Sequence, residues 1–134
     1  MKVFIDTNIL ISAAKNPNGK PFLSFCKAVT YPNNGIICEQ NIDEIRRIFI
    51  QKFPSQIHLL ENFLKDTLPF LKVVSIPIDK FHEEDKIRDL ADRPILRAAF
   101  SAGAEIFITG DKDFLEADIK AFKIMTVNEF LNMK

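Results

Sequence analysis

The sequence is poor in several residue types that would mark particular classes of protein. Its 134 residues include no tryptophan, one tyrosine, four glycines and two cysteines. Cys26 and Cys38 are isolated and lack the spacing of a metal site, so we interpret them as buried thiols in a reducing cytoplasm. Thirteen phenylalanines supply almost all of the aromatic rings, which predicts a Phe-rich interior, with some rings available for a subunit contact.

The sequence also lacks a charge excess and a long apolar run. Lysine plus arginine and aspartate plus glutamate each number 18, so the net charge is zero. This balance argues against non-specific nucleic-acid binding through a broad basic surface, but it leaves local basic patches open. No apolar run approaches the roughly 18 residues of a membrane span, and Asp6 and Asn8 interrupt the apolar start. We expect a soluble cytoplasmic protein with no membrane association, and a single domain over residues 1–134.

Short apolar runs alternate along the chain with segments of helical periodicity. Strands are predicted at 2–6, 36–38, 72–76, 105–109 and 123–126. Helices are predicted at 7–15, 22–29, 41–53, 55–71, 93–103 and 127–133, with 41–53 and 55–71 forming a helical hairpin and the charged run 79–92 forming a loop with a turn or two of helix. Asp92 is placed to cap the helix that follows it, and Gly103 to end that helix. Strands that alternate with helices indicate an α/β protein with a parallel sheet covered on both faces.

Carboxylates follow two of the predicted strands directly. Asp6 comes after the first strand, and Asp111 follows the strand at 105–109 after Gly110. In a parallel sheet both would project from the same edge, where such proteins place their functional crevice. Each acid also has a simpler reading: Asp6 could cap a helix, Asp111 and Asp113 could be turn residues, and Asp92 could be only an N-cap. Glu44, on the edge of an apolar helix face, could be a solvated charge.

Taken together, these acids favour a cation site. Several carboxylates in one crevice would repel one another unless a cation neutralised them. Hard oxygen ligands suit Mg²⁺ or Mn²⁺, which bind phosphate oxygens and lower the pKa of a bound water. The chemistry that this predicts is hydrolysis or transfer at phosphorus.

Several motifs together resemble the PIN-domain ribonucleases, in particular the VapC-like toxin branch. They are "FIDTNILISA" at the start, "NIDEI" around Glu44, and "ADRPILRAAFSAGAEIFITGDKDF" in the last third. The order and spacing of the segments also fit over essentially the whole chain. The resemblance implies a three-layer α/β/α sandwich with a five-stranded parallel sheet, and a Mg²⁺ or Mn²⁺-dependent endoribonuclease in which a metal-activated water attacks an RNA phosphodiester.

The resemblance also implies a set of site residues and partners. The catalytic and metal-binding quartet falls on Asp6, Glu44, Asp92 and Asp111, with Asp113 as an additional metal ligand. Asn8 and Thr109 match positions whose side chains hold the first carboxylate by hydrogen bonds. Family members commonly form homodimers, and the toxin branch pairs each toxin with a small antitoxin. We expect an antitoxin peptide across the crevice, with an Arg facing the carboxylates.

Three alternatives remain open at the level of sequence. Asp89 competes with Asp92 as a ligand, although the "D-x-P-I-L" context favours Asp92. Glu39 competes with Glu44, because Glu39 directly follows the second strand, although Glu44 matches the helical position of the family. The protein could also be a non-catalytic PIN-fold module that binds RNA or a protein, but all four quartet positions are acidic, which favours catalysis.

Overall fold

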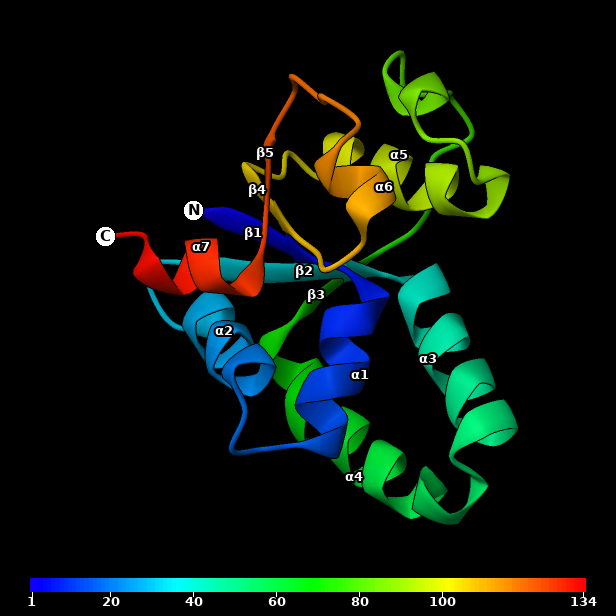
Figure 1. Ribbon diagram of the computed structural model, residues 1–134, viewed down its shortest axis with the longest axis vertical. Coiled ribbons are helices and arrows are strands. Elements are labelled where there is room, and N and C mark those ends of the chain that lie inside the picture. Colours follow the sequence, from blue (N-terminus) through cyan, green and yellow to red (C-terminus); the bar gives the residue numbers. More distant parts are fainter.

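The computed structural model describes all 134 residues, which fold around one five-stranded parallel sheet (Figure 1). The strand order is β3-β2-β1-β4-β5, so the first strand of the chain is central in the sheet and the last strand lies at an edge. The strands are β1 (Lys2–Ile5), β2 (Asn34–Cys38), β3 (Lys72–Val74), β4 (Ile106–Ile108) and β5 (Lys123–Met125). This arrangement confirms the predicted α/β fold with a five-stranded parallel sheet.

Seven α-helices cover the two faces of the sheet and form the outer layers (Figure 1). The helices are α1 (Thr7–Lys15), α2 (Lys20–Val29), α3 (Glu39–Lys52), α4 (Ile57–Thr67), α5 (Arg93–Ser101), α6 (Lys112–Leu115) and α7 (Val127–Asn132). Helices α1 to α4 and α7 lie on one face, and α5 and α6 lie on the other. The predicted packing of α3 against α4 is present. None of the helices combines the length and the apolar character needed to cross a membrane.

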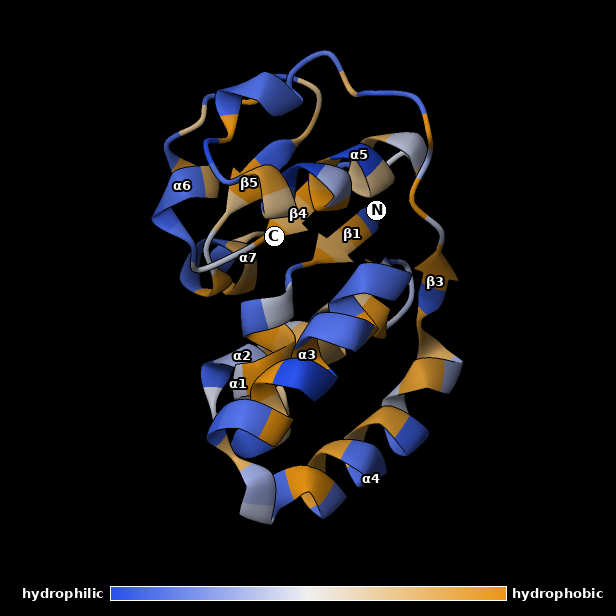
Figure 2. Ribbon diagram, turned by 90° about the vertical axis from the view of Figure 1, so that its right-hand side faces the viewer, coloured by the Kyte–Doolittle hydropathy of each residue, from blue (hydrophilic) through white to orange (hydrophobic).

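Two hydrophobic cores lie on opposite faces of the sheet because successive strand residues point to opposite sides. In β1, Val3 and Ile5 enter the core beneath α1 to α4 and α7, whereas Phe4 enters the core beneath α5 and α6. Phe4 stacks on Phe107 of β4 with ring centroids 5.3 Å apart. Figure 2 shows the largely hydrophobic strands β1 and β4 between helices that carry hydrophilic residues. The predicted Phe-rich interior is thus present on both faces of the sheet, because phenylalanines pack in both cores.

The start of α5 differs from the prediction. Asp92 precedes α5, but its side chain makes no capping hydrogen bond. The reason is a 3₁₀ turn, Leu90–Asp92, that runs directly into α5 and places Asp92 in a helical backbone conformation. Asp89 caps that turn instead, because its Oδ1 accepts from the Ala91 N–H at 2.9 Å. At the other end, Gly103 has φ +75° and ends the helix as predicted.

The charged run before α5 is a loop with 3₁₀ turns, as expected, yet it buries two carboxylates. Glu84 is 1% exposed and forms a bidentate pair with Arg97 of α5, with O···N distances of 2.7 and 3.0 Å. Glu83 is 6% exposed and accepts hydrogen bonds from Lys86 and from the backbone N–H groups of Lys120 and Ala121. These contacts tie the loop to α5 and to the segment before β5.

Candidate active site

The parallel sheet brings the ends of β1 and β4 together. Ile5 and Ile108 are register partners, and the Asp6 N–H donates to the Ile108 carbonyl at 3.0 Å. Asp6 therefore leaves the sheet beside the segment that leads from β4 to Asp111. This juxtaposition agrees with the prediction that both acids project from one edge.

All four acids of the predicted quartet line one small cavity of about 140 Å³ at this edge. The lining residues are Asp6, Thr7, Asn8, Ile11, Glu44, Ile48, Asp92, Asp111 and Phe114. They come from the start of α1, the middle of α3, the start of α5 and the start of α6. Folding thus gathers carboxylates that are up to 105 residues apart in the chain, from Asp6 to Asp111.

Asp6 is the most buried acid of the cavity, at 5% exposure. Its Oδ1 accepts from the Thr7 N–H at 2.8 Å, and its Oδ2 accepts from the Thr109 hydroxyl at 2.7 Å. Burial raises the pKa of Asp6 to about 7, against the lowering effect of these two hydrogen bonds, and the charges of Asp92 and Glu44 raise it further. The carboxylate is held in one orientation in a site that disfavours its charge.

Asp92 is less buried and is surrounded by other acids. Burial raises the pKa of Asp92 to about 6, and the charges of Asp89, Asp111, Glu44 and Asp113 add to this effect. Asp89 itself is exposed and its Oδ1 is used to cap the 3₁₀ turn. Asp92 therefore lines the cavity, and Asp89 does not.

Glu44 lines the cavity from α3, whereas Glu39 is exposed in the first turn of the same helix. The Glu44 carboxylate accepts a hydrogen bond from the Gln40 amide, from Nε2 to Oε1, at 2.7 Å. Gln40 was not singled out by sequence reasoning. Its spacing of four residues from Glu44 on one helix face was the available signal.

Asp111 and Asp113 occupy the start of α6. The Asp111 N–H donates to the Thr109 hydroxyl oxygen at 3.0 Å, and Asp111 Oδ1 accepts from the Asp113 N–H at 2.9 Å. Asp113 does not line the cavity, and its carboxylate lies 3.4 Å from the Arg88 guanidinium. Thr109 thus links two of the acids, since it donates to Asp6 and accepts from Asp111.

Asn8 does not make the contact expected of it. It lines the cavity, but it forms no hydrogen bond with Asp6, and its Oδ1 is buried with no hydrogen-bond partner at all. The Asp6 carboxylate instead accepts its hydrogen bonds from the Thr7 N–H and the Thr109 hydroxyl. Of the two residues expected to hold the Asp6 carboxylate by hydrogen bonds, Thr109 does so and Asn8 does not.

A buried polar link supports the start of α1, and sequence reasoning missed it. Asn41 is fully buried; its Oδ1 accepts from the Cys38 N–H at 2.8 Å, and its Nδ2 donates to the Thr7 hydroxyl at 2.8 Å. The link joins the β2–α3 junction to the residue after Asp6. An Asn at the third position of a helix is the pattern of a capping box, which was the signal that could have found it.

The chemistry of the cavity fits a divalent cation. It presents four carboxylates and no lysine or arginine. The unpartnered Asn8 Oδ1 adds another acceptor that would gain from a cation or from a water bound to one. Nowhere in the molecule do three or more His, Cys, Asp or Glu side chains already form a group that could hold a metal ion. The acids therefore share a cavity without being closed into a ligand cage, as expected of like charges that repel one another.

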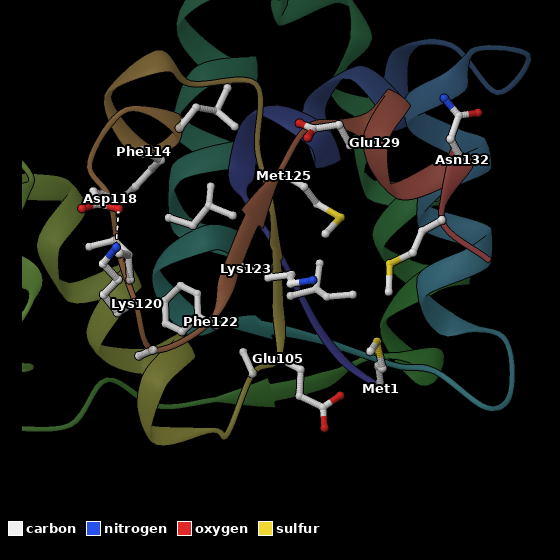
Figure 3. Close-up of a pocket in the computed structure, with 17 residues that line it drawn as sticks. Met1, Glu105, Phe114, Asp118, Lys120, Phe122, Lys123, Met125, Glu129 and Asn132 are labelled. Atoms are coloured by element: carbon white, nitrogen blue, oxygen red, sulfur yellow. Dashed lines mark ion pairs between the residues drawn. The ribbon is translucent and has the colours of Figure 1, made fainter.

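A larger cavity, of about 1040 Å³, lies beside β5 and α7 (Figure 3). Its charged residues are of both signs: Glu105 and Glu129 lie around Lys123, and Asp118 pairs with Lys120 at 3.0 Å. None of the predicted site residues lines it. Unlike the small cavity, which gathers four acids and no basic residue, this larger cavity therefore has no concentration of one charge.

Comparison with known protein families gives the same assignment as the motifs. The family model described as the PIN domain matches residues 2–113. The chain belongs to the PIN-domain family. The matched segment includes all four acids that line the cavity, together with Asn8, Thr109 and Asp113. The uncharacterized protein MJ1680 of Methanocaldococcus jannaschii is 32% identical over 120 residues, which cover 86% of this PIN-domain chain and 74% of that protein.

Solved structures share the fold of this PIN-domain chain at low sequence identity. One is a chain in the crystal structure of VapBC2 from Rickettsia felis bound to a DNA fragment from its promoter; the TM-score is 0.72, with 13% identity over 94% of this chain and 98% of that one. Another is a chain of DNA-bound VapBC from Salmonella typhimurium, with a TM-score of 0.68 and 17% identity over 95% and 98% of the two chains. At these identities the comparisons establish the fold.

Proposed function

We propose that this PIN-domain protein is a Mg²⁺ or Mn²⁺-dependent endoribonuclease that hydrolyses RNA phosphodiester bonds. The observation that carries the proposal is the cavity at the end of β1 and β4, where four carboxylates meet with no basic side chain to balance them. Burial and then the neighbouring acids raise the pKa of Asp6 and of Asp92, and a cation in the cavity would relieve both effects, which supports the proposal. Membership of the PIN-domain family, whose members are generally nucleases, supports the same activity.

In this proposal Asp6, Glu44, Asp92 and Asp111 bind the ion, and Asp113 supplements them from the exposed side of α6. A bound divalent ion supplies positive charge to the phosphate and lowers the pKa of a water. Asp6 provides a fixed oxygen, because Thr7 and Thr109 determine the orientation of its carboxylate. Thr109 also positions the backbone of Asp111. Asn8 offers its free Oδ1 to the same cavity.

The activity is tested by cleavage of a labelled RNA in Mg²⁺, in Mn²⁺ and in EDTA. Asp6→Asn should reduce cleavage by about 100-fold or more, since the loss of a residue that only supports a metal ligand already costs 10–100-fold. Asp43→Asn is the matched control, because Asp43 is exposed on α3 beside Glu44 and outside the cavity. Equal cleavage by Asp6→Asn and the parent protein, purified identically, would refute the enzymatic proposal. RNA binding without cleavage by the parent would instead support a non-catalytic RNA-binding module.

We propose further that the protein is the toxin of a toxin–antitoxin pair. The fold is shared with chains of VapBC complexes, and the acidic cavity would accept an Arg side chain of an antitoxin peptide. Strong induction of the protein alone should arrest growth, and Asp6→Asn should relieve the arrest. A small protein encoded beside it should co-purify with it. Normal growth on induction of the active nuclease would contradict the toxin role.

A homodimer is the expected assembly. Helices α3 and α4 expose apolar side chains that a subunit contact could cover, with exposures of 62% for Ile50, 36% for Ile57 and 37% for Leu59. Light scattering should give a mass of twice the 15.3 kDa of one chain. A mass of one chain at micromolar concentration would contradict this expectation.

A further inference from the structure

Gln40, on α3, joins two parts of the acidic cavity that are distant in sequence. Its Nε2 lies 2.7 Å from Glu44 Oε1 and 2.8 Å from the carbonyl oxygen of Ala91. An amide nitrogen carries two hydrogens, so one group can donate to both acceptors at once. One side chain therefore bonds directly to the Glu44 carboxylate and to the residue just before Asp92.

This contact is the only hydrogen bond between α3 and residues 89–92. Two further hydrogen bonds of the 3₁₀ turn are internal to it: the Ala91 N–H donates to Asp89 Oδ1, and the Asp92 N–H donates to the Asp89 carbonyl. Without Gln40, the orientation of Glu44 and the distance from α3 to the turn would be set by packing alone. Glu44 and Asp92 repel each other, since the charge of Glu44 disfavours ionisation of Asp92.

Gln40 is also neutral. A lysine or arginine in its place would hold the carboxylates by neutralising them, and would compete with a cation for the same oxygens. The amide restrains Glu44 through a single oxygen, Oε1, and leaves Oε2 without a protein donor. The arrangement is that of a residue that orients a metal ligand without occupying the site.

We propose that Gln40 is a positioning residue of the metal centre, which holds Glu44 and the Asp92 turn in the relative placement that a divalent ion requires. The inference rests on the proposed function, because it takes Glu44 and Asp92 to be metal ligands. Gln40 itself touches neither ion nor substrate.

The test measures Mn²⁺ affinity rather than activity. Gln40→Met keeps the length of the side chain and removes both donors. Gln40→Asn keeps the amide but shortens it by one methylene, so that it cannot span both acceptors. Gln51→Met is the matched control, since Gln51 is exposed near the end of the same helix. Calorimetric titration of metal-free protein with Mn²⁺ should show binding about tenfold weaker for both Gln40 variants and unchanged for Gln51→Met.

A second measurement separates positioning from folding. In EDTA the unfolding midpoint of Gln40→Met should fall by no more than about 4 °C, because the two hydrogen bonds of this partly exposed side chain together contribute about 1 kcal/mol. The rise in midpoint on adding Mn²⁺ should be smaller for the variant than for the parent. Equal Mn²⁺ affinity in the parent and both Gln40 variants would overturn the inference and leave the proposed function intact. Absence of Mn²⁺ binding by the parent would overturn the metal-dependent function itself.

Discussion

Two pairs of carboxylates in this protein, all of them at least partly buried, have opposite environments. In the loop before α5, Glu83 and Glu84 face donors. Burial alone would raise the pKa of Glu83, but Lys86 and two backbone N–H groups outweigh it, and the Arg97 guanidinium likewise lowers the pKa of Glu84. In the cavity, Asp6 and Asp92 face other acids, and both have a raised pKa.

The comparison separates carboxylates whose charge the fold compensates from carboxylates whose charge it leaves uncompensated. Burial costs free energy for any ionised carboxylate unless hydrogen bonds and an opposite charge compensate. The fold supplies that compensation for Glu83 and Glu84, which anchor a loop. It leaves Asp6 and Asp92 undercompensated, which is the condition in which a cation gains most by binding.

The largest effect on stability is expected from breaking the compensated pair. Glu84→Ala leaves the Arg97 guanidinium without its partner in a largely buried place, since the Glu84 side chain is 2% and the Arg97 side chain 22% exposed. We expect a loss of about 4 kcal/mol in the free energy of unfolding, measured by urea denaturation. Glu61→Ala, which breaks the exposed pair with Arg46 at 3.1 Å, is the control and should cost less than about 1 kcal/mol. Comparable losses would show that the Glu84 pair is no more structural than a surface pair.

Asp6→Asn, in contrast, should increase the free energy of unfolding of the metal-free protein at pH 8. The folded pKa of about 7 lies above the ordinary aspartate pKa of 3.8, so the carboxyl favours folding only while it is protonated, and stability should fall as the pH rises from about 4 through 7. The difference in pKa corresponds to about 4 kcal/mol at pH 8. The loss of the Thr109 hydrogen bond reduces the gain to about 2 kcal/mol.

Urea denaturation of the parent and Asp6→Asn in EDTA at pH 5 and pH 8 tests this. The two proteins should be about equally stable at pH 5, because an ionisation penalty of about 1.6 kcal/mol nearly equals the lost hydrogen bond of about 2 kcal/mol, whereas the variant should be more stable by about 2 kcal/mol at pH 8. Saturating Mn²⁺ should reverse the order, because only the parent keeps the full ligand set. A parent protein that becomes more stable between pH 5 and pH 8 in EDTA would contradict the raised pKa of Asp6.

A smaller effect of the same sign is expected for Asp92→Asn. Its pKa is raised to about 6, and its partial exposure lets solvent screen the neighbouring acids. We expect the variant to be about 1 kcal/mol more stable than the parent at pH 8 in EDTA. Asp89→Asn is the matched comparison and should instead lose stability slightly, because Asp89 caps the turn. A gain for Asp89→Asn equal to that for Asp92→Asn would place Asp89 among the undercompensated acids.

Much of the architecture could be predicted from the sequence, for local reasons. The apolar runs that became β1 and β4 have the length and composition of buried strands, and Gly103 marks the end of α5 because it adopts a positive φ. The short helix α6 was not among the predicted helices, because four residues carry too little periodicity to be recognised. The side chain of Asp92 was predicted to cap α5, but the preceding 3₁₀ turn removed the extended conformation that capping needs.

The acidic residues of the candidate site could be predicted from the sequence, but the hydrogen bonds that support them could not. Position after a strand pointed to Asp6 and Asp111, and motif spacing pointed to Glu44 and Asp92. The hydrogen bond between Gln40 and Ala91 spans 51 residues, and the burial of Glu83 and Glu84 depends on Arg97 and on the segment before β5. No local pattern encodes these contacts.

The sequence by itself determined the order of strands and helices along the chain, and the acids that follow them. The reason is that hydrophobic periodicity and secondary-structure propensity are properties of neighbouring residues. Only the tertiary structure decided which carboxylates are paired and which are left facing one another. That outcome depends on donors brought from distant segments, such as Arg97 for Glu84 and the segment before β5 for Glu83, because an ionised carboxylate is stable in a buried place only where donors meet it.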